Sequence, residues 1–285
     1  MEAFRPKTLP AAAAPVVVGT ALALGDGVVH WVSAFLALMS ALLIQVGTNL
    51  FNDYADFQKG ADTDSRIGPL RVTQAGLIKP RSVLIGAIIA FILSAVSGAY
   101  LMYRGGLPIV IIGVVSICCG FLYTGTRYSL SYTGLADLFV LIFFGPVAVA
   151  GTYYVQALSV SSLEIIAGLS PGLLATAILL VNNIRDVEED RLANKNTLIV
   201  RSSIKTGYAA YLIAIIVAGA IPVVLSVMGL GPPWGLLAGI VVVPGAFLFA
   251  RLRSAETGDA YNKVLAATAK LLLLYAVLFA VGWNI

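Results

Sequence analysis

Residues 31–71 read WVSAFLALMSALLIQVGT and then NLFNDYADFQKGADTDSRIGPLR, so an uncharged run turns abruptly acidic. Residues 31–48 carry no charged side chain. A run of this length is close to the roughly 20 apolar residues that cross a bilayer as a helix. The sequence therefore predicts a membrane helix that ends in a cluster of acids, namely Asp53, Asp56, Asp62 and Asp64.

A second stretch repeats this arrangement. Residues 182–201 read NNIRDVEEDRLANKNTLIVR and again follow an apolar run. In both stretches an asparagine precedes an aspartate by four residues, as in Asn52–Asp56 and Asn182–Asp186. The two stretches together hold eight of the chain's fourteen acidic residues. We interpret them as two halves of one site, and we expect Asp64 and Glu188 to belong to the solvated background.

The composition excludes an ordinary soluble protein. Of the 285 residues, 59% are hydrophobic and 11% are charged, whereas a soluble domain carries about 25% charged residues. Long apolar runs without alternation favour helices over a membrane barrel. The net charge of +4 needs no nucleic-acid partner, because basic loops orient membrane proteins. We expect one domain over residues 1–285, with no obligate protein partner.

Nine apolar segments are candidates to span the membrane, so the predicted fold is all-α, with nine transmembrane helices around a central chamber. Of the 18 lysines and arginines, 16 fall on one side of this topology. The positive-inside rule then places the N-terminus and both acidic stretches in the cytoplasm. The segments are 10–24, 31–51, 82–103, 107–123, 134–155, 163–184, 206–228, 234–250 and 264–283.

The acidic side chains are arranged in stripes. At about 100° per residue, Asn182, Asp186 and Asp190 share one helix face, and a second face is shared by Asn49, Asn52, Asp53 and Asp56. Carboxylates packed together near a bilayer are costly unless a cation compensates them. Mg²⁺ suits such a site, because it prefers oxygen ligands and often binds carboxylates together with substrate phosphates. Neither cluster has a nearby His or Cys, which argues against zinc.

Basic residues lie in the same two loops and could bind phosphate oxygens, the arginines through paired hydrogen bonds. Lysines and arginines also orient the protein, so we expect only some of them to contact a ligand. The candidates are Lys59, Arg66, Arg71, Lys195 and Arg201.

With these residues, the chain resembles the UbiA-type intramembrane aromatic prenyltransferases. That family carries the motifs N-D-x-x-D-x-x-x-D and D-x-x-x-D. The second is intact here as Asp186 and Asp190. In the first, Gly60 stands where the last acid is expected, and the acid is delayed to Asp62. This longer form, together with FRPKTLPAAAAPVVVGTALA (4–23) and GLADLFVLIFFGPVAVAGTYYVQ (134–156), is similar to the branch that prenylates 1,4-dihydroxy-2-naphthoate in menaquinone synthesis.

The resemblance implies a polyprenyl diphosphate donor and an aromatic acid acceptor in a multi-pass enzyme of the prokaryotic plasma membrane, with its site facing the cytoplasm. Ionisation of the donor would give an allylic cation that the naphthoate ring attacks, with loss of its carboxylate. Asn49, Asn52 and Asn182 would orient the metals or the diphosphate. The metal ligands and catalytic acids would be Asp53, Asp56, Asp62, Asp186 and Asp190, with Mg²⁺ as cofactor.

A carbocation requires a dry, aromatic-lined chamber. Tyr123, at the cytoplasmic end of segment 107–123, is the tyrosine we single out for this role. Asp137 is a candidate for binding the acceptor or for positioning Arg127. A buried, hydrogen-bonded carboxyl without a catalytic role is an equally good interpretation of Asp137.

Two other interpretations remain open. A cation-coupled transporter would also carry membrane acids and proline-interrupted helices, but its ion sites usually lie near the midplane rather than at the helix ends. A related prenyltransferase could instead use another acceptor, such as 4-hydroxybenzoate, homogentisate, haem or a glycerol phosphate.

Overall fold

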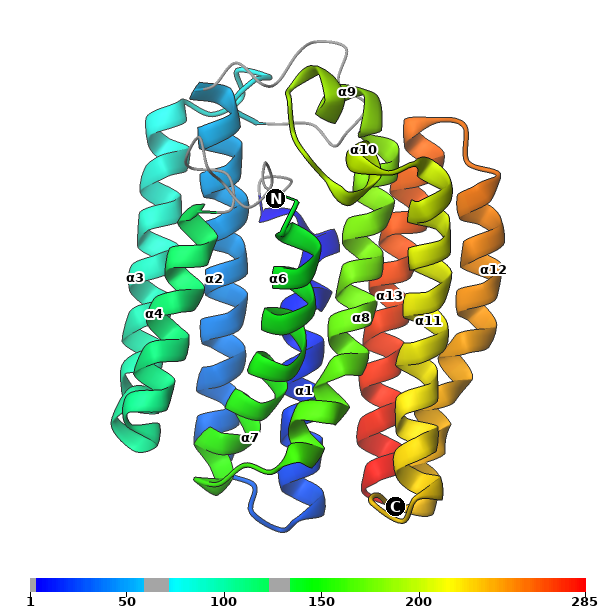
Figure 1. The fold of residues 1–285 in the computed structure, drawn as a ribbon. Helices are drawn as coiled ribbons and strands as arrows, with labels where there is room; N and C mark the ends of the chain where they lie inside the picture. Colours follow the sequence, from blue (N-terminus) through cyan, green and yellow to red (C-terminus); the bar gives the residue numbers. More distant parts are fainter. Residues whose placement is uncertain (1–3, 59–71, 123–133) are drawn as a thin grey trace.

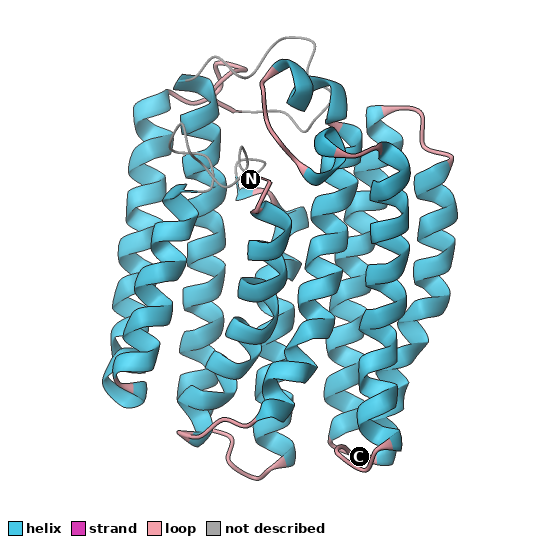
Figure 2. Cartoon of the chain, viewed as in Figure 1, coloured by secondary structure: helices cyan, strands magenta, loops and turns pink. Residues whose placement is uncertain are grey.

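The computed structural model describes residues 4–58, 72–122 and 134–285, and these contain helices but no β-strand (Figure 2). The prediction of an all-α membrane fold is confirmed. The elements are η2 (Pro6–Thr8), α1 (Leu9–Gly25), α2 (Trp31–Gln58), α3 (Pro80–Gly105), α4 (Leu107–Leu122), α6 (Ala136–Ile142), η3 (Phe143–Val147), α7 (Ala148–Ala157), α8 (Ser162–Arg185), α9 (Val187–Leu192), α10 (Leu198–Arg201), α11 (Ile204–Val227), η4 (Pro233–Val241), α12 (Val242–Arg253) and α13 (Gly258–Trp283).

Within the described residues, eight helical stretches are long and apolar enough to cross a membrane. The chain from α6 to α7 forms one of them, and η4 with α12 forms another. α4 is a shorter apolar helix, and its 16 residues would reach only about 24 Å at 1.5 Å per residue, against a hydrocarbon core of roughly 30 Å. Each predicted segment overlaps a helix, but nine crossings stay a prediction.

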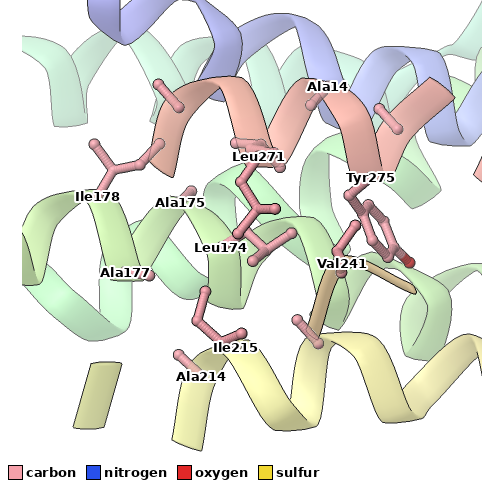
Figure 3. Packing of buried hydrophobic residues seen from close by; sticks show 14 of the residues in the cluster. Ala14, Leu174, Ala175, Ala177, Ile178, Ala214, Ile215, Val241, Leu271 and Tyr275 are labelled. Atoms are coloured by element: carbon pink, nitrogen blue, oxygen red, sulfur yellow. The ribbon is translucent and has the colours of Figure 1, made fainter. Parts of the chain in front are cut away.

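α8 is the central helix of the bundle. In its most apolar window, 67% of the residues are buried, a larger share than in the other candidate spans. α8 packs against α11 and α13, and α1 in turn packs along α13 and α7. Figure 3 shows Leu174 of α8 between Ile215 of α11 and Leu271 of α13. This core fixes the position of the helix that carries the second acidic stretch.

The span from Ala136 to Ala157 is broken in its middle. Gly145 leaves helical geometry, at φ −120° and ψ −110°, and Pro146 follows it in the π-helical turn η3. The break lies directly on α8, because a methyl group added at Gly168 would come within 2.7 Å of the Pro146 Cα. A methyl group at Gly172 would clash with the Leu141 carbonyl oxygen. Glycines therefore allow the two backbones to touch.

α2 and α8 run in the same direction, with α1 and α6 between them in the view of Figure 1. Their C-terminal ends lie at the end of the bundle where α9 and α10 are found, and the C-terminus of the chain lies at the opposite end (Figure 1). At that opposite end the Tyr153 hydroxyl donates to Asp26 at 2.6 Å, and Arg104 Nε donates to the Val155 carbonyl at 2.8 Å. The described part of the first acidic stretch, residues 49–58, and the second stretch therefore share one end of the bundle, as predicted.

Candidate active site

One cavity of about 450 Å³ lies between α1, α2, α3, α4, the α6–α7 span and α8. Most of its lining is apolar. Polar side chains from both acidic stretches line the end of the cavity where α2 and α8 end, and further polar residues, such as Ser40, Ser94 and Thr152, line it elsewhere. The polar lining residues from these stretches are Asn49, Asn52, Asp56, Asn182, Asn183, Asp186, Asp190, Lys195 and Thr197.

On the α2 side, Asp56 and Asn52 line the cavity and are buried. Asp53 is also buried but is not among the lining residues. Its carboxylate instead accepts a hydrogen bond from the Thr73 hydroxyl, which also donates to the Asp53 carbonyl at 3.3 Å. The predicted stripe is thus divided, since Asp53 faces the start of the segment that leads to α3. The assignment of Asp53 as a metal ligand stays a prediction.

Asn49 also lines the cavity, but its amide is engaged by the N-terminal segment. Asn49 Nδ2 donates to the Phe4 carbonyl and to the Thr8 hydroxyl, both at 3.0 Å. Gln45 Nε2 donates to the Asn49 Oδ1 at 3.3 Å. These bonds hold the η2 turn over the cavity, next to Arg5, which is a further lining residue. Asn49 therefore positions the start of the chain in this structure.

On the α8 side, the predicted continuous helix is interrupted. α8 ends at Arg185, and Asp186 leaves helical geometry at φ −97° and ψ 12° before α9 begins. The Asp190 N–H nevertheless donates to the Asp186 carbonyl at 2.8 Å. This bond preserves the four-residue step, so Asn182, Asp186 and Asp190 all reach the cavity.

Arg185 is the residue of this site that the sequence interpretation missed. It is 5% exposed. Its Nε and Nη2 donate to the two carboxylate oxygens of Asp186, each at 2.6 Å. Nη2 also donates to the Asn182 Oδ1 at 2.8 Å, and Nη1 donates to the Asn262 Oδ1 of α13 at 2.6 Å. The sequence feature that could have revealed this role is the position of Arg185, one residue before Asp186 and three residues after Asn182.

Asp190 lies farther along the cavity wall. The Lys195 Nζ lies 3.2 Å from its Oδ1. Burial raises the pKa of the Asp190 carboxyl above its usual range, the charge of Asp186 adds to this effect, and Lys195 opposes it. A buried carboxylate in this setting favours a bound cation. Lys195 also lines the cavity, where a lysine suits phosphate oxygens.

Two further polar groups point to a ligand. Asn183 is buried and lines the cavity, and its Nδ2 has no hydrogen-bond partner within residues 4–58, 72–122 and 134–285. Asn183 lies next to the predicted stripe of Asn182, Asp186 and Asp190 but is not part of it. Asp137 also lines the cavity, and neither of its buried carboxylate oxygens accepts a hydrogen bond from another described residue. Buried polar groups are rarely left without partners.

The apolar part of the cavity is aromatic where α6 passes into η3. The rings of Phe139 and Phe143 lie parallel, at an interplanar angle of 2° with centroids 5.5 Å apart, and both residues line the cavity with Phe144. Such a surface excludes water and can stabilise a cation through its ring faces.

Several predicted residues are not placed in the cavity. Arg201 ends α10 and packs against Gly134, because a methyl group added there would lie 3.0 Å from its Cζ. Gly134 lines the cavity whereas Arg201 does not. The remaining candidates lie outside the described residues, and they are Lys59, Asp62, Arg66, Arg71 and Tyr123, together with Arg127.

The donor set suits magnesium better than a softer metal. In the parts of the chain that the structure describes, no group of three or more His, Cys, Asp or Glu side chains forms a ready-made metal site. Asp56 of α2, Asp186 at the junction of α8 and α9, and Asp190 of α9 instead face one cavity. Mg²⁺ commonly takes one or two carboxylates and completes its shell with water and substrate phosphates. The residues present fit that mode of binding.

Comparison with known proteins decides the family. The model of the UbiA prenyltransferase family matches residues 12–274. The chain belongs to the UbiA prenyltransferase family. It is 38% identical, over 97% of its length and 93% of the relative, to the 1,4-dihydroxy-2-naphthoate octaprenyltransferase of Mycobacterium tuberculosis. It is 42% identical to the protein of the same name in Escherichia coli, over 70% of this chain and 67% of that one.

A solved structure supports the UbiA fold. The UbiA homologue of Archaeoglobus fulgidus bound to DMAPP and Mg²⁺ aligns with 99% of this chain and 98% of its own, with a TM-score of 0.64 and 15% identity. At that identity the likeness concerns the fold alone.

Proposed function

We propose that this chain transfers a polyprenyl group from a polyprenyl diphosphate to 1,4-dihydroxy-2-naphthoate within the membrane. The observation that carries the proposal is the cavity itself, in which acids from α2, the α8–α9 junction and α9 lie at one end of an apolar, aromatic-lined chamber. Relatives that are 38% and 42% identical to this chain, over 97% and 70% of its length, carry the matching name. A diphosphate would occupy the acidic end, and the prenyl tail would lie among the helices.

In this proposal, Asp56, Asp186 and Asp190 hold the cation, with Asp62 as a further candidate outside the described residues. Bound Mg²⁺ would supply positive charge that stabilises diphosphate as a leaving group. Lys195 and the free donor of Asn183 face the same space and hydrogen-bond the diphosphate oxygens. Arg185 holds the Asp186 carboxylate in place through hydrogen bonds to both of its oxygens.

The chamber determines where the allylic group goes after the bond to the diphosphate oxygen breaks. The ring faces of Phe139 and Phe143 stabilise positive charge on the allylic carbons and keep water away. The acceptor ring forms the new carbon–carbon bond to the allylic carbon and loses its carboxylate as carbon dioxide. The product is demethylmenaquinone in its reduced form, together with diphosphate.

The distribution of lysine and arginine along the sequence supports an orientation with the acidic end in the cytoplasm. The bacterial relatives support placement in a prokaryotic plasma membrane. Both substrates would then reach the cavity from the cytoplasmic side or from the bilayer.

The experiment is mass spectrometry of the products made by the purified protein in lipid nanodiscs. Dihydroxynaphthoate and a series of prenyl diphosphates are supplied, with 4-hydroxybenzoate as the competing acceptor. Prenylated, decarboxylated naphthoquinol is expected with Mg²⁺, is lost with EDTA and returns when Mg²⁺ is restored. If 4-hydroxybenzoate alone were prenylated, it would be the acceptor in place of dihydroxynaphthoate. The absence of any prenylated product would favour the cation-coupled transporter.

A further inference from the structure

Asp137 is a carboxylate in the cavity wall that the metal and diphosphate chemistry leaves unused. It lies in the first turn of α6, on a different element from Asp56, Asp186 and Asp190. Both of its oxygens are buried, and neither accepts a hydrogen bond from another residue in 4–58, 72–122 and 134–285. No described cluster of three or more acids includes it.

This arrangement is unfavourable for the protein on its own. A carboxylate withdrawn from water without a hydrogen-bond partner destabilises the folded state, and the chain could avoid that cost with an apolar residue of similar size. Ionisable groups placed in this way within membrane proteins usually serve function. The missing partner is a hydrogen-bond donor, because an ionised carboxylate only accepts hydrogen bonds.

The surroundings of Asp137 indicate the kind of molecule that brings this donor. Phe139 and Phe143 follow along the same span as a parallel ring pair, and Phe144, two helical turns after Asp137, also lines the cavity. Flat aromatic ligands pack well on such rings. The carboxylate and the rings together suit a flat aromatic molecule that carries a hydroxyl group.

We propose that Asp137 binds the aromatic acceptor by accepting a hydrogen bond from one of its ring hydroxyls. The inference rests on the proposed function and adds the residue that selects the acceptor. The bond fixes the ring in the chamber and leaves the hydroxyl oxygen more electron-rich, which favours attack on the allylic carbon. An acceptor that lacks the hydroxyl group leaves Asp137 unpaired and binds more weakly.

The test compares Asp137→Asn and Asp137→Leu with the wild type and with Glu188→Gln, whose exposed side chain pairs with Arg191. In the product assay, the acceptor KM should rise about 10- to 100-fold in both Asp137 variants, as expected for a lost hydrogen bond to a charged group. The KM for prenyl diphosphate and the Mg²⁺ requirement should stay within about twofold of the wild type. Without ligand, both variants should melt at the wild-type temperature or above it, because an unpaired buried charge has been removed.

Other results would overturn the inference. An unchanged acceptor KM in both variants would do so. A lower melting temperature together with an equal loss of kcat/KM for the acceptor and the prenyl diphosphate would also do so, because it would assign Asp137 a structural role. Saturating dihydroxynaphthoate should raise the melting temperature of the wild type but not that of Asp137→Leu. A wild type that makes no naphthoquinol product would refute the proposed function instead, so the two failures can be told apart.

Discussion

Arg185 and Asp186 are neighbours in the sequence, yet they form a two-pronged ion pair in which Nε and Nη2 each lie 2.6 Å from a different carboxylate oxygen. The arginine side chain is 1% exposed and the aspartate side chain 9% exposed. The remaining guanidinium nitrogen, Nη1, donates to Asn262 of α13. The helix that carries the second acidic stretch is thereby tied to the C-terminal helix at the site.

This pair leads to the first prediction. Arg185→Lys should lower kcat about 10- to 100-fold, because a lysine lacks the planar fork that holds both Asp186 oxygens, and losing a residue that orients a metal ligand typically costs this much activity. Asn262→Ala should cost about tenfold, since it removes one support of the guanidinium. Arg191→Lys, at an exposed pair with Glu188, serves as the matched control. Steady-state kinetics in nanodiscs would measure all three, and equal rates for Arg185→Lys and Arg191→Lys would contradict a positioning role.

The carboxylates of the cavity give the second prediction. Asp56→Asn and Asp186→Asn keep the shape of the side chain but remove its charge, so each should reduce turnover by at least about 100-fold, as when one group that stabilises the transition state is lost. The elution volume in size-exclusion chromatography should not change. Glu188→Gln, with a side chain that is 73% exposed, should retain full turnover. Near-normal rates in both aspartate variants would remove these residues from the reaction.

The contact between α8 and the α6–η3 segment gives a prediction about stability. Gly172→Ala should lower the free energy of unfolding by about 1–3 kcal/mol, the usual cost of overpacking, because the added methyl group clashes with the Leu141 carbonyl. Gly86→Ala is the control, since its methyl group would meet only the Leu50 Cδ1 at 3.4 Å. Thermal unfolding followed by fluorescence would compare them. If the two variants melted at the same temperature, the close approach of the two backbones would not contribute to the stability of the fold.

The orientation is open to a labelling test. In a cysteine-free background, with Cys118 and Cys119 replaced by Ala, Leu230→Cys and Glu256→Cys place single thiols in exposed loops at opposite ends of the bundle. We expect a membrane-impermeant maleimide to label intact cells at position 230 and to label position 256 only after lysis. The reverse pattern would invert the topology inferred from the lysines and arginines.

The sequence was sufficient to predict the helical fold and the meeting of the two acidic stretches, because apolar run length and helical phase are local properties. It could not predict that Asp53 turns toward Thr73, since that contact depends on how the chain enters α3. The partner of Arg185 on α13 lies 77 residues away, and no spacing rule connects them. Likewise, the missing hydrogen-bond partners of Asp137 become visible only once the cavity is formed.

The account depends on α2 and α8 contributing to one metal–diphosphate site. The most direct measurement is anomalous diffraction from crystals grown with Mn²⁺ and a prenyl thiolodiphosphate that ionises slowly. We predict a manganese peak within coordination distance of carboxylate oxygens from both Asp56 and Asp186, with the diphosphate bound between them. A peak bound by residues of one helix only, or one located outside this cavity, would contradict the account.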